Sequence, residues 1–156
     1  RYFNVYGLGE QHKGRMSSVI YQFNNQVLKE GKIKLFKGSH GFQDGEQKRD
    51  FVYIDDVIKI NLWFMKRPLI SGIFNVGTGV ARSFNEVANL VCQWFENKSI
   101  KCKIVYVDFP EDLINSYQSF TCADLQKIRN IGFDDEFHSI EEGVNDYLSL
   151  LNSNEY

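Results

Sequence analysis

Residues 49–57 read RDFVYIDDV, and this stretch decides how the chain folds. Its first part, residues 49–54, is rich in aromatic and β-branched side chains and predicts a short strand. Asp55 and Asp56 then stand where helix caps belong. The apolar positions that follow have helical spacing: Val57, Ile58, Leu62 and Met65. The stretch therefore predicts a strand that runs directly into a helix.

Upstream of this unit the chain predicts another strand, helix and strand. Residues 1–7 read RYFNVYG, a strand that ends at a glycine turn. Apolar residues recur at helical spacing over residues 16–28, and Gly31 supplies a stop. Residues 32–36 predict a strand, and the glycine-rich stretch 37–48 predicts a loop. Because the chain opens inside a strand, we expect further sequence upstream of it.

Downstream the alternation of strands and helices continues. Residues 73–76 and 103–107 predict strands, and capping boxes at Ser83 and Ser139 predict the starts of two helices. A weaker pair of caps predicts one more helix: Thr121 and Asp124. Strands that alternate with helices indicate the α/β class.

Composition excludes several classes of protein. The net charge of -2 argues against a nucleic-acid-binding protein, which would carry a basic excess. No apolar run approaches the ~18 residues that a membrane helix needs. The three cysteines lack CxxC spacing and are predicted to be reduced thiols rather than a disulfide framework or a zinc site. We therefore expect a cytoplasmic protein without a bound metal.

The chain contains no complete catalytic motif. The nearest approach to a dinucleotide fingerprint is GTGVAR at residues 77–82, but Arg82 stands where the third glycine is needed. A plain turn between a strand and a helix is the better interpretation. None of the eight tyrosines has a lysine four residues later, the pair that short-chain dehydrogenases use.

Three stretches together carry a family resemblance: residues 1–7, 49–57 and 74–79. Their order and spacing resemble the C-terminal half of the extended short-chain dehydrogenase/reductase superfamily. The resemblance implies that residues 1–156 comprise the last strands of a Rossmann sheet and the smaller substrate-binding α/β lobe. It also implies that the N-terminal dinucleotide-binding part is missing and that this chain alone is inactive and marginally stable.

A finer resemblance is to the epimerases that act on carbon 6 of an ADP-linked heptose. Five segments carry it: HKG at 12–14, KLFKGS at 34–39, NLWF at 61–64, SGIFN at 71–75 and YQSFT at 117–121. It implies conversion of ADP-D-glycero-D-manno-heptose to ADP-L-glycero-D-manno-heptose, a precursor of the lipopolysaccharide inner core. Bound NADP would oxidise that carbon transiently to a ketone and return the hydride to the opposite face. The family forms homo-oligomers, often pentamers, and uses neither nucleic acid nor a membrane.

The resemblance implies that Lys13, in the His-Lys-Gly element, is one of two acid/base groups and lies close to the cofactor. A free lysine titrates near ~10.4, so acid/base work near neutral pH needs desolvation or a neighbouring cation such as Arg15. The alternative is a surface lysine in the first turn of a helix. Val5 is expected to touch the cofactor, and Asn4 is expected to hydrogen-bond the sugar.

Other positions are implied to bind the nucleotide sugar. Phe36, Lys37, Gly38 and Ser39 are expected to line the nucleotide site. The planar fork of Arg49 suits a diphosphate, although an ion pair with Asp50 or Glu46 is the competing interpretation. Tyr117 is expected to close over the ligand, with core packing as its alternative. Arg15 and Gln22 replace the serine and histidine that contact the nucleotide sugar in better-known members, and Leu8 replaces a proline.

Two other functions remain open from the sequence. One is a different nucleotide-sugar enzyme of the superfamily, a 4-epimerase or a 4,6-dehydratase, which the His-Lys-Gly element disfavours. The other is a non-catalytic ADP-sugar-binding fragment, which upstream coding sequence would distinguish.

Overall fold

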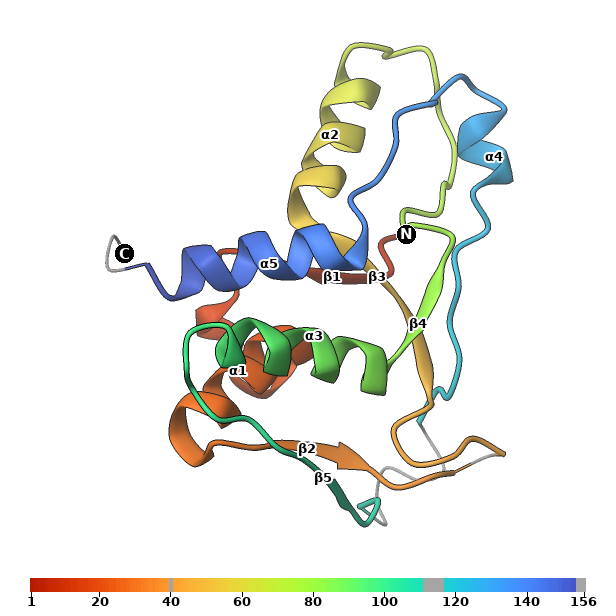
Figure 1. The fold of residues 1–156 in the computed structure, drawn as a ribbon. Helices are drawn as coiled ribbons and strands as arrows, with labels where there is room; N and C mark the ends of the chain where they lie inside the picture. The colour runs from red at the N-terminus through yellow and green to blue at the C-terminus, as the bar shows by residue number, and fades with distance from the viewer. Residues whose placement is uncertain (40, 111–116, 154–156) are drawn as a thin grey trace.

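A computed structural model describes residues 1–39, 41–110 and 117–153 and gives an α/β fold (Figure 1). The strands are β1 (Asn4–Tyr6), β2 (Ile33–Phe36), β3 (Lys48–Tyr53), β4 (Ala81–Ser83) and β5 (Ile104–Val107). The helices are η1 (Gln11–Met16, a 3-10 helix), α1 (Val19–Glu30), α2 (Ile54–Met65), α3 (Phe84–Glu96), α4 (Gln126–Arg129) and α5 (Ile140–Leu151).

The strands form two small sheets. In the first, β3 is central, pairing parallel with β1 and antiparallel with β4. In the second, β2 and β5 pair in parallel. The helices α1 and α3 lie between this second sheet and α5, and α3 packs against both α1 and α5 (Figure 1).

Two apolar clusters fill the interior. The larger one joins α1, α3 and α5 to the inner faces of β2 and β3, with Phe23, Val91 and Leu148 almost fully buried. The smaller one packs α2 and the 128–133 region against Val52 of β3. Strand β3 therefore contributes to both clusters, which is why its residues 49–53 are all buried.

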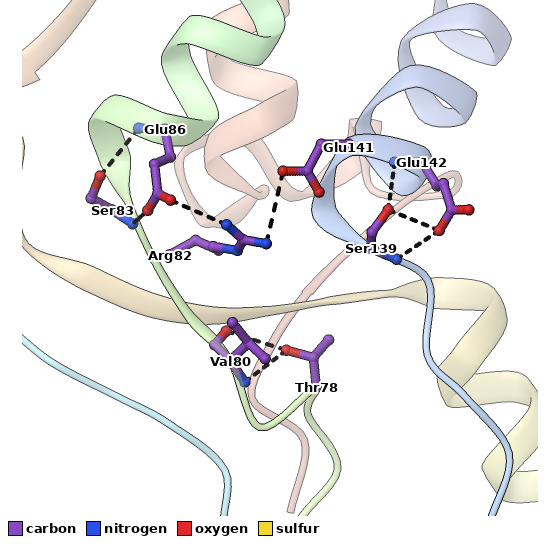
Figure 2. A network of polar contacts seen from close by, with 8 residues as sticks. All are labelled: Thr78, Val80, Arg82, Ser83, Glu86, Ser139, Glu141 and Glu142. Atoms are coloured by element: carbon purple, nitrogen blue, oxygen red, sulfur yellow. Dashed lines mark hydrogen bonds and ion pairs between the residues drawn. The ribbon is translucent and has the colours of Figure 1, made fainter.

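The predicted helix ends are confirmed at several positions. Gly31 ends α1 in the left-handed conformation, with φ of 65°. Ser83 and Ser139 begin α3 and α5 with complete capping boxes that involve Glu86 and Glu142. Figure 2 shows both boxes, together with Arg82, which lies between Glu86 at 3.2 Å and a carboxylate of α5 at 3.8 Å. This ionic bridge links the starts of the two helices.

Three local predictions are wrong. Asp55 and Asp56 do not cap α2, whose N-cap position is Tyr53; both lie in its first turn. The buried carboxylate of Asp56 instead accepts the backbone N–H of His138 at 2.9 Å. Residues 73–76 form only an isolated bridge between Tyr2 and Val76 rather than a strand.

The caps predicted near α4 are correct only in part. Asp124 accepts the backbone N–H of Gln126 at 2.8 Å and so supports the start of this short helix. Thr121 does not cap it, because its hydroxyl accepts a hydrogen bond from Asn4 at 3.2 Å. Asn4, a residue far away in the sequence, therefore binds the Thr121 hydroxyl that the local sequence pattern had assigned to the helix cap.

The prediction of three reduced cysteines is wrong for one pair. Cys92 on α3 and Cys102 before β5 form a disulfide, with their Cα atoms 5.2 Å apart. Only ten residues separate them, and the turn after α3 returns the chain beside the helix end. Cys122 is a free thiol. Among the described residues every helix is too short or too polar to cross a bilayer.

Candidate nucleotide-sugar site

The buried carboxylate of Asp50 fixes the centre of the site. It accepts the backbone N–H of Thr78 at 2.7 Å and those of Gly79 and Ala123 at 2.9 Å, and it also accepts the Thr78 hydroxyl at 2.7 Å. The backbone N–H groups of Thr78 and Gly79 in the glycine turn at 77–79 are thus bound by a carboxylate of the protein itself. Its N–H groups are therefore not free to cradle a phosphate, as expected of a plain turn, but the turn leads into β4 rather than directly into a helix.

Arg49 precedes Asp50 and, by the alternation of a strand, projects to the opposite face. Its side chain is 8% exposed, and its guanidinium donates to the Lys48 carbonyl at 2.9 Å. The guanidinium carbon lies 4.9 Å from the ring centre of Tyr117 and 5.8 Å from that of Phe84. Burial lowers the pKa of Arg49.

No carboxylate pairs with Arg49 in the part of the chain that the structure describes. The competing prediction of an ion pair with Asp50 or Glu46 is wrong, because Asp50 binds backbone N–H groups and Glu46 accepts from Asn85 at 2.6 Å. A buried cation without an anion is costly. Among the described residues, the contacts of the Arg49 guanidinium are therefore one backbone carbonyl and the two aromatic rings.

Aromatic rings surround this cation. Tyr117 meets the ring of Phe109 edge-on, with centroids 4.7 Å apart, and Phe36 lies 4.6 Å from Phe109. Burial raises the pKa of Tyr117 although Arg49 opposes the shift, so the hydroxyl stays protonated at neutral pH. Tyr117 is half-buried, so its alternative, packing in the core, describes it only in part.

Beside these rings lies a cavity of about 260 Å³ with a mainly apolar lining. Its lining combines α1, β2 and residues around them: Val19, Gln22, Phe23, Gln26, Lys34, Leu35, Phe36, Gln47, Phe84, Val107 and Tyr117. Three predicted substrate residues, Gln22, Phe36 and Tyr117, are therefore brought to one place. An apolar cavity next to a buried cation suits a planar base attached to a phosphate.

Gln22 connects the cavity to the segment that bears Lys13. Its amide group donates to the Ser17 carbonyl at 2.8 Å and to the Arg15 carbonyl at 3.3 Å. The side chains of Lys13 and Arg15 are both exposed on η1, and neither lines the cavity. The structure thus places Lys13 next to the entrance of α1 but does not bring its amine onto Tyr117.

Asn4 and Val5 lie on the edge strand β1. The Asn4 amide donates to the Asp50 carbonyl at 3.1 Å and to the Thr121 hydroxyl at 3.2 Å, which ties it to the strand that bears Arg49. Val5 is half-buried and packs against the smaller cluster. Both side chains are therefore fixed by contacts within this chain. Their expected roles, Asn4 towards the sugar and Val5 towards the cofactor, stay predictions.

The residues after β2 line a second, more open hollow. Lys37 pairs with Asp108 at 2.7 Å, an exposed ion pair that raises the pKa of Lys37. The Gly38 N–H donates to Asp44 at 2.7 Å, and the Ser39 hydroxyl accepts from Gln47 at 3.4 Å. The expected contact of Lys37 with phosphate would require exchange of its present carboxylate partner.

Sequence reasoning missed three residues of the site: Asp50, Phe84 and Phe109. Asp50 lies inside the stretch that carries the family resemblance. Its position next to Arg49 was the sequence signal that could have identified it as a site residue. No group of three or more His, Cys, Asp or Glu side chains within the described ranges could hold a metal ion.

Residues 1–77 match the NAD dependent epimerase/dehydratase family. Over those residues the chain resembles this family, and its fold is that of the C-terminal half of the extended short-chain dehydrogenase epimerases. A solved Helicobacter pylori structure, an ADP-L-glycero-D-manno-heptose-6-epimerase, has a TM-score of 0.75 and 32% identity to it. The match covers 98% of this chain and 43% of that chain.

Two curated relatives are more similar in sequence, and both are named ADP-L-glycero-D-manno-heptose-6-epimerase. The Alkalilimnicola ehrlichii protein is 49% identical over 97% of this chain, which covers 46% of the relative. The Thiobacillus denitrificans protein is 48% identical, again over 97% of this chain, which covers 49% of the relative. The chain therefore spans about half the length of the curated relatives that it matches.

Proposed function

We propose that this chain is the substrate-binding part of an epimerase that acts on carbon 6 of the heptose in ADP-D-glycero-D-manno-heptose. The names of relatives at 48–49% identity support the substrate. The proposal includes a place in lipopolysaccharide precursor synthesis, a cytoplasmic location and a homo-oligomer. The alternatives are a 4-epimerase or dehydratase of another nucleotide sugar, and an ADP-sugar-binding fragment without catalysis.

The observation that carries the proposal is the buried Arg49 beside the aromatic cavity, which has no carboxylate partner among the described residues. In the proposed complex the adenine ring enters the cavity that Phe36 and Tyr117 line. The diphosphate then reaches Arg49, whose two N–H edges give bidentate, charge-assisted hydrogen bonds. The sugar extends towards Asn4, and Lys13 serves as one of the two acid/base groups.

The described residues do not fit a dinucleotide by themselves, because the Asp50 carboxylate occupies the N–H groups of the only fingerprint-like turn. The proposal therefore assigns binding of NADP mainly to sequence outside this chain. Val5 and Lys13 are the residues here that would contact it. In this proposal Arg49 binds the diphosphate, the apolar cavity binds the adenine ring, and Lys13 transfers a proton.

Replacing Arg49 with Met is expected to raise the KM for ADP-heptose about 10- to 100-fold, since lost charged hydrogen bonds amount to ~1.5–3 kcal/mol. Met fills the same space without a buried charge, so the melting temperature should stay or rise. The measurement is steady-state kinetics of the full-length protein with ADP-D-glycero-D-manno-heptose, with product analysis and parallel assays on UDP-sugars.

The matched control is Arg67→Met, which removes an exposed arginine that stacks on Trp63 at 4.0 Å. Its KM should equal that of wild type. An unchanged KM in the Arg49 variant would remove the diphosphate role of this residue. Turnover of a UDP-sugar without turnover of the ADP-heptose would favour the 4-epimerase or dehydratase alternative.

A further inference from the structure

The carboxylate of Glu10 is a buried acid that the proposed chemistry does not use. Its side chain is 3% exposed and stands directly before η1. One oxygen accepts the backbone N–H of Ser18 at 2.6 Å, and the other accepts the Ser18 hydroxyl at 2.5 Å and the Tyr147 hydroxyl at 2.8 Å. Three donors thus converge on one buried carboxylate.

Glu10 also holds the backbone of η1. Its carbonyl accepts the N–H of Lys13 at 2.9 Å, while its side chain holds Ser18 on the far side of the same helix. All six residues of η1 are exposed, and the helix is kinked at Gly14, with φ of 52° and ψ of -120°. The position of η1 is therefore set by hydrogen bonds at its ends rather than by apolar packing of its own side chains.

Tyr147, near the opposite end of the chain, also takes part in these hydrogen bonds. It lies on α5, 137 residues from Glu10, and its side chain is fully buried. Burial first, and then its hydrogen bond to Glu10, raises the pKa of Tyr147. The hydroxyl therefore remains a hydrogen-bond donor, and α5, which carries it, packs against α3.

We propose that Tyr147 and Glu10 form a clamp that positions Lys13 for proton transfer. Neither residue of the clamp touches substrate; each acts through the backbone of η1. The clamp rests on the proposed function, because it gives Lys13 its orientation for the acid/base role. Proton transfer is sensitive to misplacement of the reacting groups, for which a shift of 1 Å can cost ~10²-fold.

The test uses the full-length enzyme with Tyr147→Phe, which removes only the hydroxyl that donates to Glu10. The kcat for ADP-heptose should fall about 10- to 100-fold, with a KM within about twofold of wild type, because the binding cavity is untouched. Hydrogen exchange at the amides of residues 11–16 should rise. On a Lys13→Met background, Tyr147→Phe should cause no further loss.

Val144→Ala is the matched control, since it creates a cavity in the same buried face of α5 without touching Glu10. A fall in kcat of equal size in this control, at a similar loss of melting temperature, would mean that general destabilisation explains the effect. Unchanged kcat or unchanged exchange in Tyr147→Phe overturns the clamp. Wild-type turnover in Lys13→Met overturns the proposed role of Lys13, while the exchange data still show whether Tyr147 orders η1.

Discussion

The full-length enzyme with Lys13→Met is expected to epimerise ADP-D-glycero-D-manno-heptose about 10²- to 10⁴-fold more slowly than wild type, the usual contribution of a general acid/base. Methionine keeps an unbranched side chain of similar length but cannot carry a proton. Because Lys13 does not line the cavity beside Arg49, the KM should change little. The measurement is product formation resolved by chromatography over long incubations.

The control for this result is Lys101→Met, which removes another exposed lysine at a distance along the chain from η1. Its turnover should match wild type. If Lys13→Met also matches wild type, Lys13 is a surface lysine and another group must move the proton. A large rise in KM with kcat preserved would instead mean that Lys13 binds the nucleotide sugar.

Local signals predicted most of the fold. Helices α1, α3 and α5 could be located because apolar spacing and end signals agree: Gly31 stops the first, and complete capping boxes start the other two. Each of these signals acts within a few residues of the chain. It therefore survives without knowledge of the tertiary partners.

Predictions that depended on a distant partner were the ones that failed. Asp56 has a good position for a helix cap, but in the folded chain its carboxylate is hydrogen-bonded to the backbone N–H and the ring of His138. Residues 73–76 look like a strand, yet in the described chain they form only the isolated bridge between Tyr2 and Val76. The Cys92–Cys102 disulfide depends on how tightly the chain turns after α3, which cysteine spacing does not encode.

The site was predictable in part for the same reason. The resemblance named Arg49, Phe36 and Tyr117, and the structure brings the three together around one aromatic cluster. Phe84 and Phe109 complete the cluster but carry no local pattern that distinguishes them from core rings. Glu10, which stands before the helix that bears Lys13, is bound by Tyr147 of α5 across 137 residues, a contact that no short motif reveals.

Asp50→Asn is expected to destabilise the folded protein by about 2–6 kcal/mol, since two buried donors lose their acceptor. The amide that replaces the carboxylate keeps one acceptor oxygen and turns an NH₂ group towards N–H donors. At least one pair of buried N–H groups, such as those of Gly79 and Ala123, then loses its partner at ~1–3 kcal/mol each. In a full-length protein this corresponds to a fall in melting temperature of roughly 10 °C, measured by calorimetry.

Asp146→Asn makes the same chemical change on the exposed face of α5 and should stay within about ±0.5 kcal/mol of wild type. The comparison isolates burial and backbone contacts as the cause, because charge and side-chain size change equally in both variants. Asp50 also fixes β3, from which Arg49 projects to the other face. Loss of Asp50 should therefore weaken ADP-heptose binding well below the melting temperature. A variant that melts like wild type would mean that the three N–H groups find other partners, and that the Asp50 carboxylate is not needed to hold the turn at 77–79.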